Sequence, residues 1–265
     1  GYNRISIGVQ SFDKNELKVL DRAHGPEEIH STIDQARAAG FDNLSLDLMF
    51  AIPNQSLSKW QDNLHQALEK NPEHISTYNL TIEQGTAFSK LQSLGKIAMP
   101  TDDRQLDLYK ESIEFLVNNG FLHYEISNFA QPGRECAHNI TYWENKNTLG
   151  LGAGASSYMG GVRFKNINLP SQYIQNIIEK HIGVEQKESL KLRQAMGETI
   201  MLGLRLMKGI SIPQFEKRFQ VSFKSLFGDT ISSLKEKGLI AIEEDNLRLS
   251  EKGLFLADSV ILEFI

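Results

Sequence analysis

Between residues 3 and 158, apolar runs alternate with amphipathic segments, and this alternation constrains the fold more than any other feature of the chain. The strand-like runs are Arg4–Val9, Leu44–Phe50, Ile75–Leu80 and Phe121–Ile126. The segments between them carry apolar residues at helical spacing, as in Ile29, Ile33 and Ala36. Alternating strands and helices are typical of βα units around a parallel sheet. We therefore predict an α/β fold with a parallel sheet for this part of the chain.

From about Pro170 the pattern changes to successive helices, and we predict no strand before Leu239. One long helix is predicted at Leu190–Met207, buried on several sides. After it come two helices, two short strands and a terminal helix, an order that resembles a winged-helix module. The near-neutral charge of the segment favours the alternative, a compact helical cap. We place a first domain at residues 1–168 and a second at 169–265.

Composition excludes several classes of protein. With 28 basic and 33 acidic residues, the net charge of −5 argues against a nucleic-acid-binding surface. A single cysteine rules out an intrachain disulfide or a cluster held by several cysteines of this chain, and makes a cytoplasmic location the simplest expectation. We find no signal peptide and no apolar run that could span a bilayer. Because the chain begins without Met next to a strand-like run, we expect sequence to be missing at its N-terminus.

Polar side chains lie in or just after all four predicted strands: Gln10, Asp47, Asn79 with Thr81, and Glu125 with Ser127 and Asn128. In parallel βα folds, ligands bind beyond the carboxyl ends of the strands. Gln10 could instead cap the next helix, and Asp47 could pair with Arg4 or Arg22. The recurrence at successive strands nevertheless predicts a shared ligand site.

The stretch Cys136–Tyr158 combines a histidine, two aromatic residues and then a run of small residues. A histidine beside aromatic rings offers a stacking surface and a candidate metal ligand, although such a histidine is often a packing residue. Pro132 and Gly133 precede it, so we expect an irregular, accessible loop. Small residues from Gly150 onward leave room for close approach of a ligand. Cys136 is only weak evidence for a metal site. The pattern favours two ligand sites, one of them for a flat ligand.

Several segments resemble those of the radical S-adenosylmethionine proteins related to oxygen-independent coproporphyrinogen III oxidase: Asn3–Phe12, Asp47–Pro53, His74–Tyr78, Leu80–Glu83 and Tyr124–Ala130. The motif His-Asn-x-x-Tyr-Trp more closely resembles the heme-chaperone branch of that family. The resemblance covers nearly the whole chain. It implies the C-terminal portion of a partial (β/α), TIM-like barrel with S-adenosylmethionine and a [4Fe-4S] cluster, followed by a smaller, mostly helical, winged-helix-like C-terminal domain.

The resemblance also implies two sets of binding residues: Gln10, Arg22, Asp47, Thr81 and Ala155 for S-adenosylmethionine, and His138, Asn139, Tyr142 and Trp143 for heme, with His138 as the candidate iron ligand. The three cysteines that hold the cluster lie upstream in the family, so we do not expect this chain to assemble the cluster or cleave S-adenosylmethionine by itself. Two further departures are Asn54, where the family usually has Gly, and Ser156, where the heme-chaperone branch often has His.

The function that the resemblance implies is a heme chaperone that passes heme to an acceptor protein, which could lie at the membrane. One alternative is an oxygen-independent coproporphyrinogen III oxidase, which decarboxylates two propionates by hydrogen abstraction. Another is a regulatory fragment or winged-helix adaptor. The His-Asn-x-x-Tyr-Trp motif favours the first function.

Overall fold

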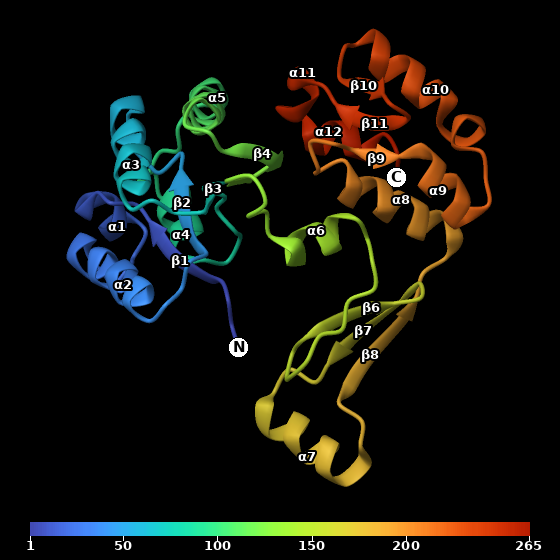
Figure 1. The fold of residues 1–265 in the computed structure, drawn as a ribbon, viewed down its shortest axis with the longest axis horizontal. Coiled ribbons are helices and arrows are strands. Elements are labelled where there is room, and N and C mark those ends of the chain that lie inside the picture. Colours follow the sequence, from blue (N-terminus) through green and yellow to red (C-terminus); the bar gives the residue numbers. More distant parts are fainter. The chain divides into compact units, whose positions relative to one another are not determined.

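The computed structural model describes all 265 residues except the side chain of Ala87. The chain forms two compact units, Gly1–Glu135 and Cys136–Ile265, here called the N-terminal and C-terminal units (Figure 1). The division at residues 168 and 169 was inferred from the change of sequence pattern, and as a boundary between family domains it stays a prediction.

The N-terminal unit is built on one five-stranded sheet of order β1-β2-β3-β5-β4. Its strands are β1 (Ile5–Gln10), β2 (Leu44–Phe50), β3 (His74–Asn79), β4 (Leu122–Glu125) and β5 (Asn128–Ala130). The first three are parallel, as predicted, and the α/β class is confirmed. The predicted fourth strand is present as β4 and runs in the same direction as the first three, but it does not pair with β3 as expected, because β5 returns antiparallel and lies between them. The Glu125 carboxylate accepts hydrogen bonds from the Ser127 backbone and the Asn128 amide, which stabilises the tight turn between β4 and β5.

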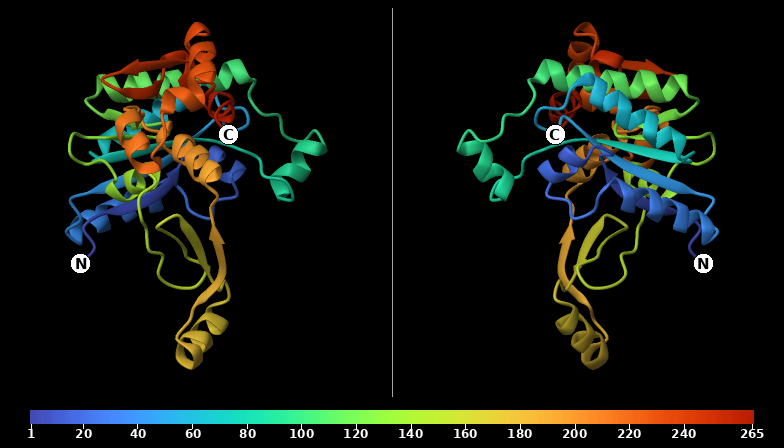
Figure 2. Two further views of the ribbon diagram at one scale, coloured as in Figure 1. Left: turned by 90° about the vertical axis from the view of Figure 1, so that its right-hand side faces the viewer. Right: turned by 90° about the vertical axis from the view of Figure 1, so that its left-hand side faces the viewer.

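The helices of this unit are α1 (Lys14–Val19), α2 (Pro26–Ala38), α3 (Leu57–Glu69), α4 (Ala87–Ser93) and α5 (Asp102–Asn118). Side-chain oxygens of Asp13, Ser56 and Thr101 accept from the first free amides of α1, α3 and α5, as helix N-caps do. Figure 1 shows α1, α2 and α3 together on one side of the sheet, and Figure 2 shows α4 projecting from the body of the unit.

The two faces of this sheet differ in chemistry. Alternate residues of β2, namely Leu44, Leu46 and Leu48, are fully buried in a core to which α2, α3 and α5 contribute. The other face carries Ser45 and Asp47 from the same strand, because successive side chains of a strand point to opposite faces. The helices therefore cover the apolar face, and the polar face is where a ligand site can form.

The C-terminal unit contains two three-stranded antiparallel sheets, of order β6-β7-β8 and β10-β11-β9. Its elements are α6 (Ala137–Trp143), β6 (Ser156–Met159), β7 (Val162–Asn166), α7 (Pro170–Lys180), β8 (Val184–Ser189), α8 (Leu192–Gly203), β9 (Ile210–Ser211), α9 (Ile212–Phe219), α10 (Phe223–Glu236), β10 (Ile240–Glu243), β11 (Asn246–Leu249), α11 (Glu251–Leu254) and α12 (Ala257–Leu262). None of the helices in the described part of the chain is long and apolar enough to cross a bilayer.

Three expectations for this unit are wrong. The parallel pattern does not extend to residue 158, since β6 belongs to an antiparallel sheet. Strands β8 and β9 lie in the region where none was predicted. The segment expected to be an irregular loop forms helix α6 instead.

The end of the chain follows the predicted order of two helices, a hairpin and terminal helices. Its core contains a cluster of phenylalanines in which the rings of Phe215 and Phe223 meet edge to face, with centroids 4.8 Å apart. The short strand β9 pairs with β11 and completes the sheet. The winged-helix-like order is therefore confirmed as a packed structure with its own core.

Candidate functional site

Asp47 lies near the middle of β2 on the polar face of the N-terminal sheet. The Ser6 hydroxyl lies 3.0 and 2.9 Å from the two carboxylate oxygens of Asp47, and the Ser45 hydroxyl lies 3.4 Å from Oδ1. Within the described side chains, Asp47 forms no ion pair with Arg4 or Arg22. The pairing considered as an alternative to ligand binding is therefore not observed. The half-buried carboxylate is held by hydroxyl donors alone and keeps acceptor capacity for the hydroxyls of a ligand.

Gln10 ends β1 in the left-handed region, with φ of 64°. A Cβ atom on Gly8 would lie only 2.8 Å from the Gln10 amide nitrogen, so the absence of a side chain at Gly8 lets this amide lie close to the strand. Asp13 caps α1, and this excludes the capping role considered for Gln10. The backbone of Gln10 pairs with Leu48, the residue after Asp47.

His74 is a buried histidine of β3 that sequence reasoning did not assign to the site. Its Nδ1 lies 2.8 Å from the Ser45 hydroxyl, and its Nε2 lies 2.8 Å from the Tyr124 hydroxyl. Burial, with a smaller contribution from the charge of Arg4, lowers the pKa of His74 to about 3. The ring is therefore neutral at physiological pH, with one nitrogen donating and the other accepting. It holds in place the serine that contacts Asp47.

The pKa of Tyr78 depends on the charged groups that lie near it on the polar face of the sheet. Burial raises the pKa of its phenol and a hydrogen bond with the Ser76 side chain lowers it; the negative charges of Asp47 and Glu125 raise it further, and Arg4 lowers it. Two of the carboxylates predicted from neighbouring strands are thus brought near one phenol. That convergence required the β4–β5 hairpin, which the sequence analysis did not foresee.

The remaining residues predicted for S-adenosylmethionine are more dispersed. Arg22 and Thr81 are exposed and follow α1 and β3, respectively. Ala155 precedes β6 in the C-terminal unit, where its carbonyl accepts from the Asn166 amide at 2.9 Å. Their role as binding residues stays a prediction.

Of the cofactors implied by the family resemblance, S-adenosylmethionine and the [4Fe-4S] cluster differ in how well this chain fits them. The carboxylate of Asp47 and the amide of Gln10 suit the ribose and amino-acid groups of S-adenosylmethionine. For the cluster, the described residues contain no group of three His, Cys, Asp or Glu side chains that could hold a metal. Cys136 is a single buried cysteine. The sequence contains one cysteine, so it does not itself hold the three cysteines that the family resemblance implies for a [4Fe-4S] cluster.

Helix α6 divides the His-Asn-x-x-Tyr-Trp motif between two faces. His138 and Tyr142 are four residues apart and both exposed, with ring centroids 4.9 Å apart and planes at 79°. On the neighbouring face, the Arg205 guanidinium lies 4.5 Å from the centre of the Trp143 ring. The Trp143 indole nitrogen is buried without a hydrogen-bond partner among the described residues. His138 and Tyr142 are therefore accessible to a ligand, whereas Trp143 packs against Arg205 and holds the helix in place. Asn139 lies on the same side of the helix as Trp143.

Contacts just after α6 fasten it further within the C-terminal unit. The Asn145 amide donates to the Thr199 hydroxyl of α8 at 2.9 Å, and Arg218 of α9 donates to the Asn145 carbonyl at 2.9 Å. Lys208 donates to Glu144 at 2.6 Å. Partial burial would by itself raise the pKa of Glu144, but hydrogen bonds from Lys146 and Lys208 outweigh this effect and lower it.

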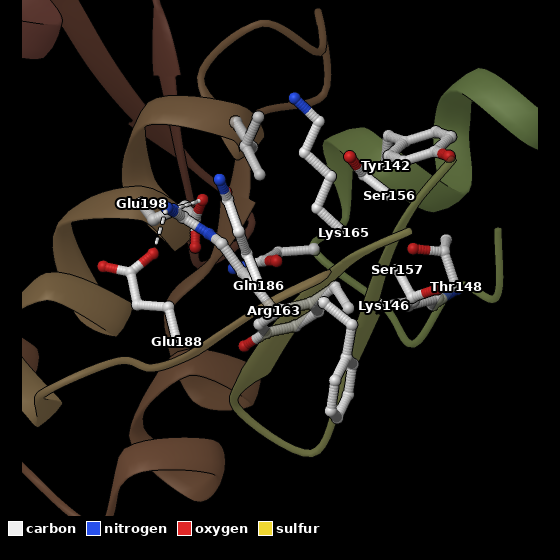
Figure 3. Close-up of a pocket in the computed structure, with 14 residues that line it drawn as sticks. Tyr142, Lys146, Thr148, Ser156, Ser157, Arg163, Lys165, Gln186, Glu188 and Glu198 are labelled. Atoms are coloured by element: carbon white, nitrogen blue, oxygen red, sulfur yellow. Dashed lines mark hydrogen bonds and ion pairs between the residues drawn. The ribbon is translucent and has the colours of Figure 1, made fainter. Parts of the chain in front are cut away.

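Two cavities flank the motif. One, of about 340 Å³, is called the Tyr142 pocket, and the other, of about 320 Å³, includes Trp143. The Tyr142 pocket is lined by residues of α6, β6, β7, β8 and α8, among them Ser156, Arg163 and Lys165 (Figure 3). Sequence reasoning missed Arg163 and Lys165, since only the pairing of β7 with β6 and β8 brings them to the motif.

Comparison with known proteins gives a consistent set of relatives. The HemN C-terminal domain family matches residues 190–256. The chain is 35% identical over 264 residues to "Heme chaperone HemW" of Lactococcus lactis, covering 99% of this chain and 69% of that protein. It is 35% identical to "Heme chaperone HemW" of Bacillus subtilis, covering 100% and 70%. It is 33% identical to the mitochondrial "Radical S-adenosyl methionine domain-containing protein 1" of Danio rerio, covering 98% and 61%.

Among solved structures, the coproporphyrinogen III oxidase HemN from Escherichia coli, described as a radical SAM enzyme, matches with a TM-score of 0.78 and 23% identity. The match covers 100% of this chain and 64% of that one. At this level of identity, the likeness supports the fold alone.

Proposed function

Because the chain belongs to the family of HemW-like, HemN-related radical S-adenosylmethionine proteins, we propose that it is a heme-binding chaperone that transfers heme to an acceptor protein. The observation that carries this proposal is the exposed face of α6, where the His138 imidazole lies beside the Tyr142 ring. An imidazole nitrogen is a common axial ligand of heme iron. The neighbouring aromatic ring provides an apolar surface for a porphyrin.

Within this proposal three of the four motif residues, His138, Tyr142 and Trp143, have different tasks. His138 is the iron ligand and Tyr142 contacts the macrocycle. Trp143 stabilises α6 through its stacking with Arg205 and does not itself need to touch heme. We expect replacement of Trp143 to weaken heme binding indirectly, by loosening the helix.

The polar face of the N-terminal sheet is the proposed site for S-adenosylmethionine. Asp47 accepts hydrogen bonds from the ribose hydroxyls, and Gln10 binds the amino-acid portion, with Arg22 and Thr81 added by the family resemblance. The resemblance also implies a contact of S-adenosylmethionine with Ala155, a residue of the C-terminal unit. Bound beside a reduced cluster, S-adenosylmethionine supplies radical chemistry in this family. Since this chain does not supply the ligands of a cluster, its own residues are assigned only to binding and positioning.

The heme proposal is tested by titrating the full-length protein with hemin and recording the Soret band. A shifted band in wild type that is lost in His138→Ala supports it. His181→Asn is the matched control, because His181 is an exposed histidine at the end of α7, outside the motif, and Asn tolerates its left-handed backbone. Absence of a hemin complex, or product formation from coproporphyrinogen III, contradicts the chaperone assignment.

The S-adenosylmethionine site is tested by calorimetric titration of the full-length protein. Asp47→Ala is expected to weaken binding, while Asp42→Ala, an exposed acid just before β2, is expected to leave it unchanged. Equal affinities for wild type and Asp47→Ala contradict this assignment without affecting the heme site.

A further inference from the structure

We propose that the Tyr142 pocket binds a carboxylate and, on the basis of the proposed heme-binding function, that its occupant is a propionate of the heme held by His138. The pocket lies wholly within the C-terminal unit, and its lining includes residues from five elements of that unit. The argument rests on the sheet register, on the distribution of charge and on the shared residue Tyr142.

Six of the residues that line the pocket lie on one face of the β6-β7-β8 sheet. Lys165 is paired with Ser156 on one side and with Gln186 on the other. Directly paired residues of antiparallel strands point to the same face. Two residues along, Tyr158, Arg163 and Glu188 form the next row on that face. The register thus places Arg163 and Lys165 side by side in the pocket.

The two carboxylates of the pocket are already bound. Arg163 donates to Glu188 at 3.3 Å and to Glu198 of α8, so one guanidinium serves both acids. Figure 3 shows these acids on one side of the pocket, and Tyr142, Ser156 and Thr148 on the other. The negative charge therefore lies at one end, where Arg163 offsets one of the two acidic charges and the second carboxylate oxygen of Glu198 is buried without a hydrogen-bond partner among the described residues.

The opposite end has donors without acceptors. Lys165 is half-buried, and its ammonium group has no ionic partner among the described side chains. The hydroxyls of Thr148 and Ser156 line the same pocket. A carboxylate in the pocket would accept a charge-assisted hydrogen bond from Lys165 and a further hydrogen bond from a nearby hydroxyl.

Tyr142 connects this end of the pocket to His138. Its ring lines the pocket, and its centroid lies 4.9 Å from that of the imidazole. Heme combines a metal that binds imidazole with propionates at one edge of a flat macrocycle. With a volume of about 340 Å³, the cavity suits one edge of such a ligand and not the whole of it. The remainder of the macrocycle would lie on the exposed face of α6.

The experiment compares hemin with hemin dimethyl ester, in which the propionate charges are removed, as ligands of the full-length protein. For Lys165→Glu we expect the dissociation constant for hemin to rise about tenfold or more, as loss of a charge-assisted hydrogen bond predicts. Affinity for the dimethyl ester should change little. Lys224→Glu is the matched control, because this exposed lysine in the first turn of α10 undergoes the same change of charge in the same unit but does not line the pocket.

The outcomes separate the two proposals. If wild type binds no hemin, the proposed function fails, and the identity of the occupant fails with it. If hemin binds and the ratio of ester to hemin dissociation constants is the same in wild type and Lys165→Glu, the pocket assignment alone is overturned. If Lys165→Glu weakens the binding of hemin and of the dimethyl ester equally and also lowers the melting temperature, the pocket assignment is likewise overturned. Lys165 would then affect binding by stabilising the fold and not by contacting a propionate.

Discussion

Buried His74 makes the stability of the N-terminal unit depend on pH. The side chain has no exposed surface, and both ring nitrogens face hydroxyl groups, from Ser45 and Tyr124. Protonation would place a cation in the interior and would remove the acceptor nitrogen. Burial, together with the nearby charge of Arg4, accordingly lowers the pKa of His74 from 6.5 to about 3.

The direction of the effect follows from proton binding. Above pH 6.5, His74 is neutral in the folded and unfolded chain, so its stabilising contribution is fully present. As the pH falls below 6.5, the unfolded chain takes up a proton that the folded chain does not bind until about pH 3. Between pH 7.5 and 5.5 this lowers the free energy of unfolding by about 1.4 kcal/mol. His123, whose pKa burial lowers to about 4, adds a similar amount.

The substitution His74→Gln removes one of these titrations while keeping an amide that can donate and accept. We expect the loss of stability between pH 7.5 and 5.5 to shrink by about 1.4 kcal/mol, roughly half of the effect of the two histidines. Urea unfolding followed by the fluorescence of buried Trp60 reports on this unit, in a Trp143→Phe background that removes the other tryptophan. An unchanged pH dependence in His74→Gln, or an NMR titration of His74 in wild type with a midpoint near 6.5, would refute the reasoning.

Two further predictions concern local packing. Gly209→Ala places a Cβ atom 2.0 Å from the Leu247 carbonyl oxygen at φ of +71°, so it should cost about 3 kcal/mol or more in urea unfolding. Gly160→Ala, with φ of +56° but open space, should cost only about 1 kcal/mol. Trp60→Phe removes an indole donor that lies 3.0 Å from the Ser112 hydroxyl, and we expect a loss of about 1–3 kcal/mol, measured by circular dichroism. A cost for Gly209→Ala no greater than that of its control, or no cost for Trp60→Phe, would contradict these assignments.

The elements predicted correctly from the sequence are those that bury a regular apolar pattern. Strand β2 alternates fully buried Leu44, Leu46 and Leu48 with polar residues on its other face, and α2 has Ile29 and Ile33 on its buried face. Such positions can be predicted from the sequence, because the spacing of the apolar residues matches the geometry of the helix or strand that buries them. The parallel part of the sheet could therefore be predicted.

The elements that were missed have no such pattern. Strand β8 has the sequence Val-Glu-Gln-Lys-Glu-Ser, is exposed throughout, and exists because it pairs with β7. The turn between β4 and β5 contains neither Gly nor Pro and depends on the Glu125 carboxylate. The basic residues of the Tyr142 pocket were missed for the same reason, because β7 pairing alone places Lys165 beside the motif. Polar strands that form by pairing with distant segments have no regular apolar pattern, so the sequence alone does not predict them.

The His-Asn-x-x-Tyr-Trp motif lies in one compact unit with the HemN C-terminal domain, because residues of that domain pack against one face of α6. A helix of seven residues is too short to hold its orientation alone. Arg205 packs on Trp143, and Thr199 binds Asn145; both belong to the segment matched by that domain. The face that carries His138 is thus positioned by residues far from it in sequence. Under the proposed function, these contacts orient His138 for heme, and loosening either contact should reduce hemin affinity while leaving the imidazole itself intact.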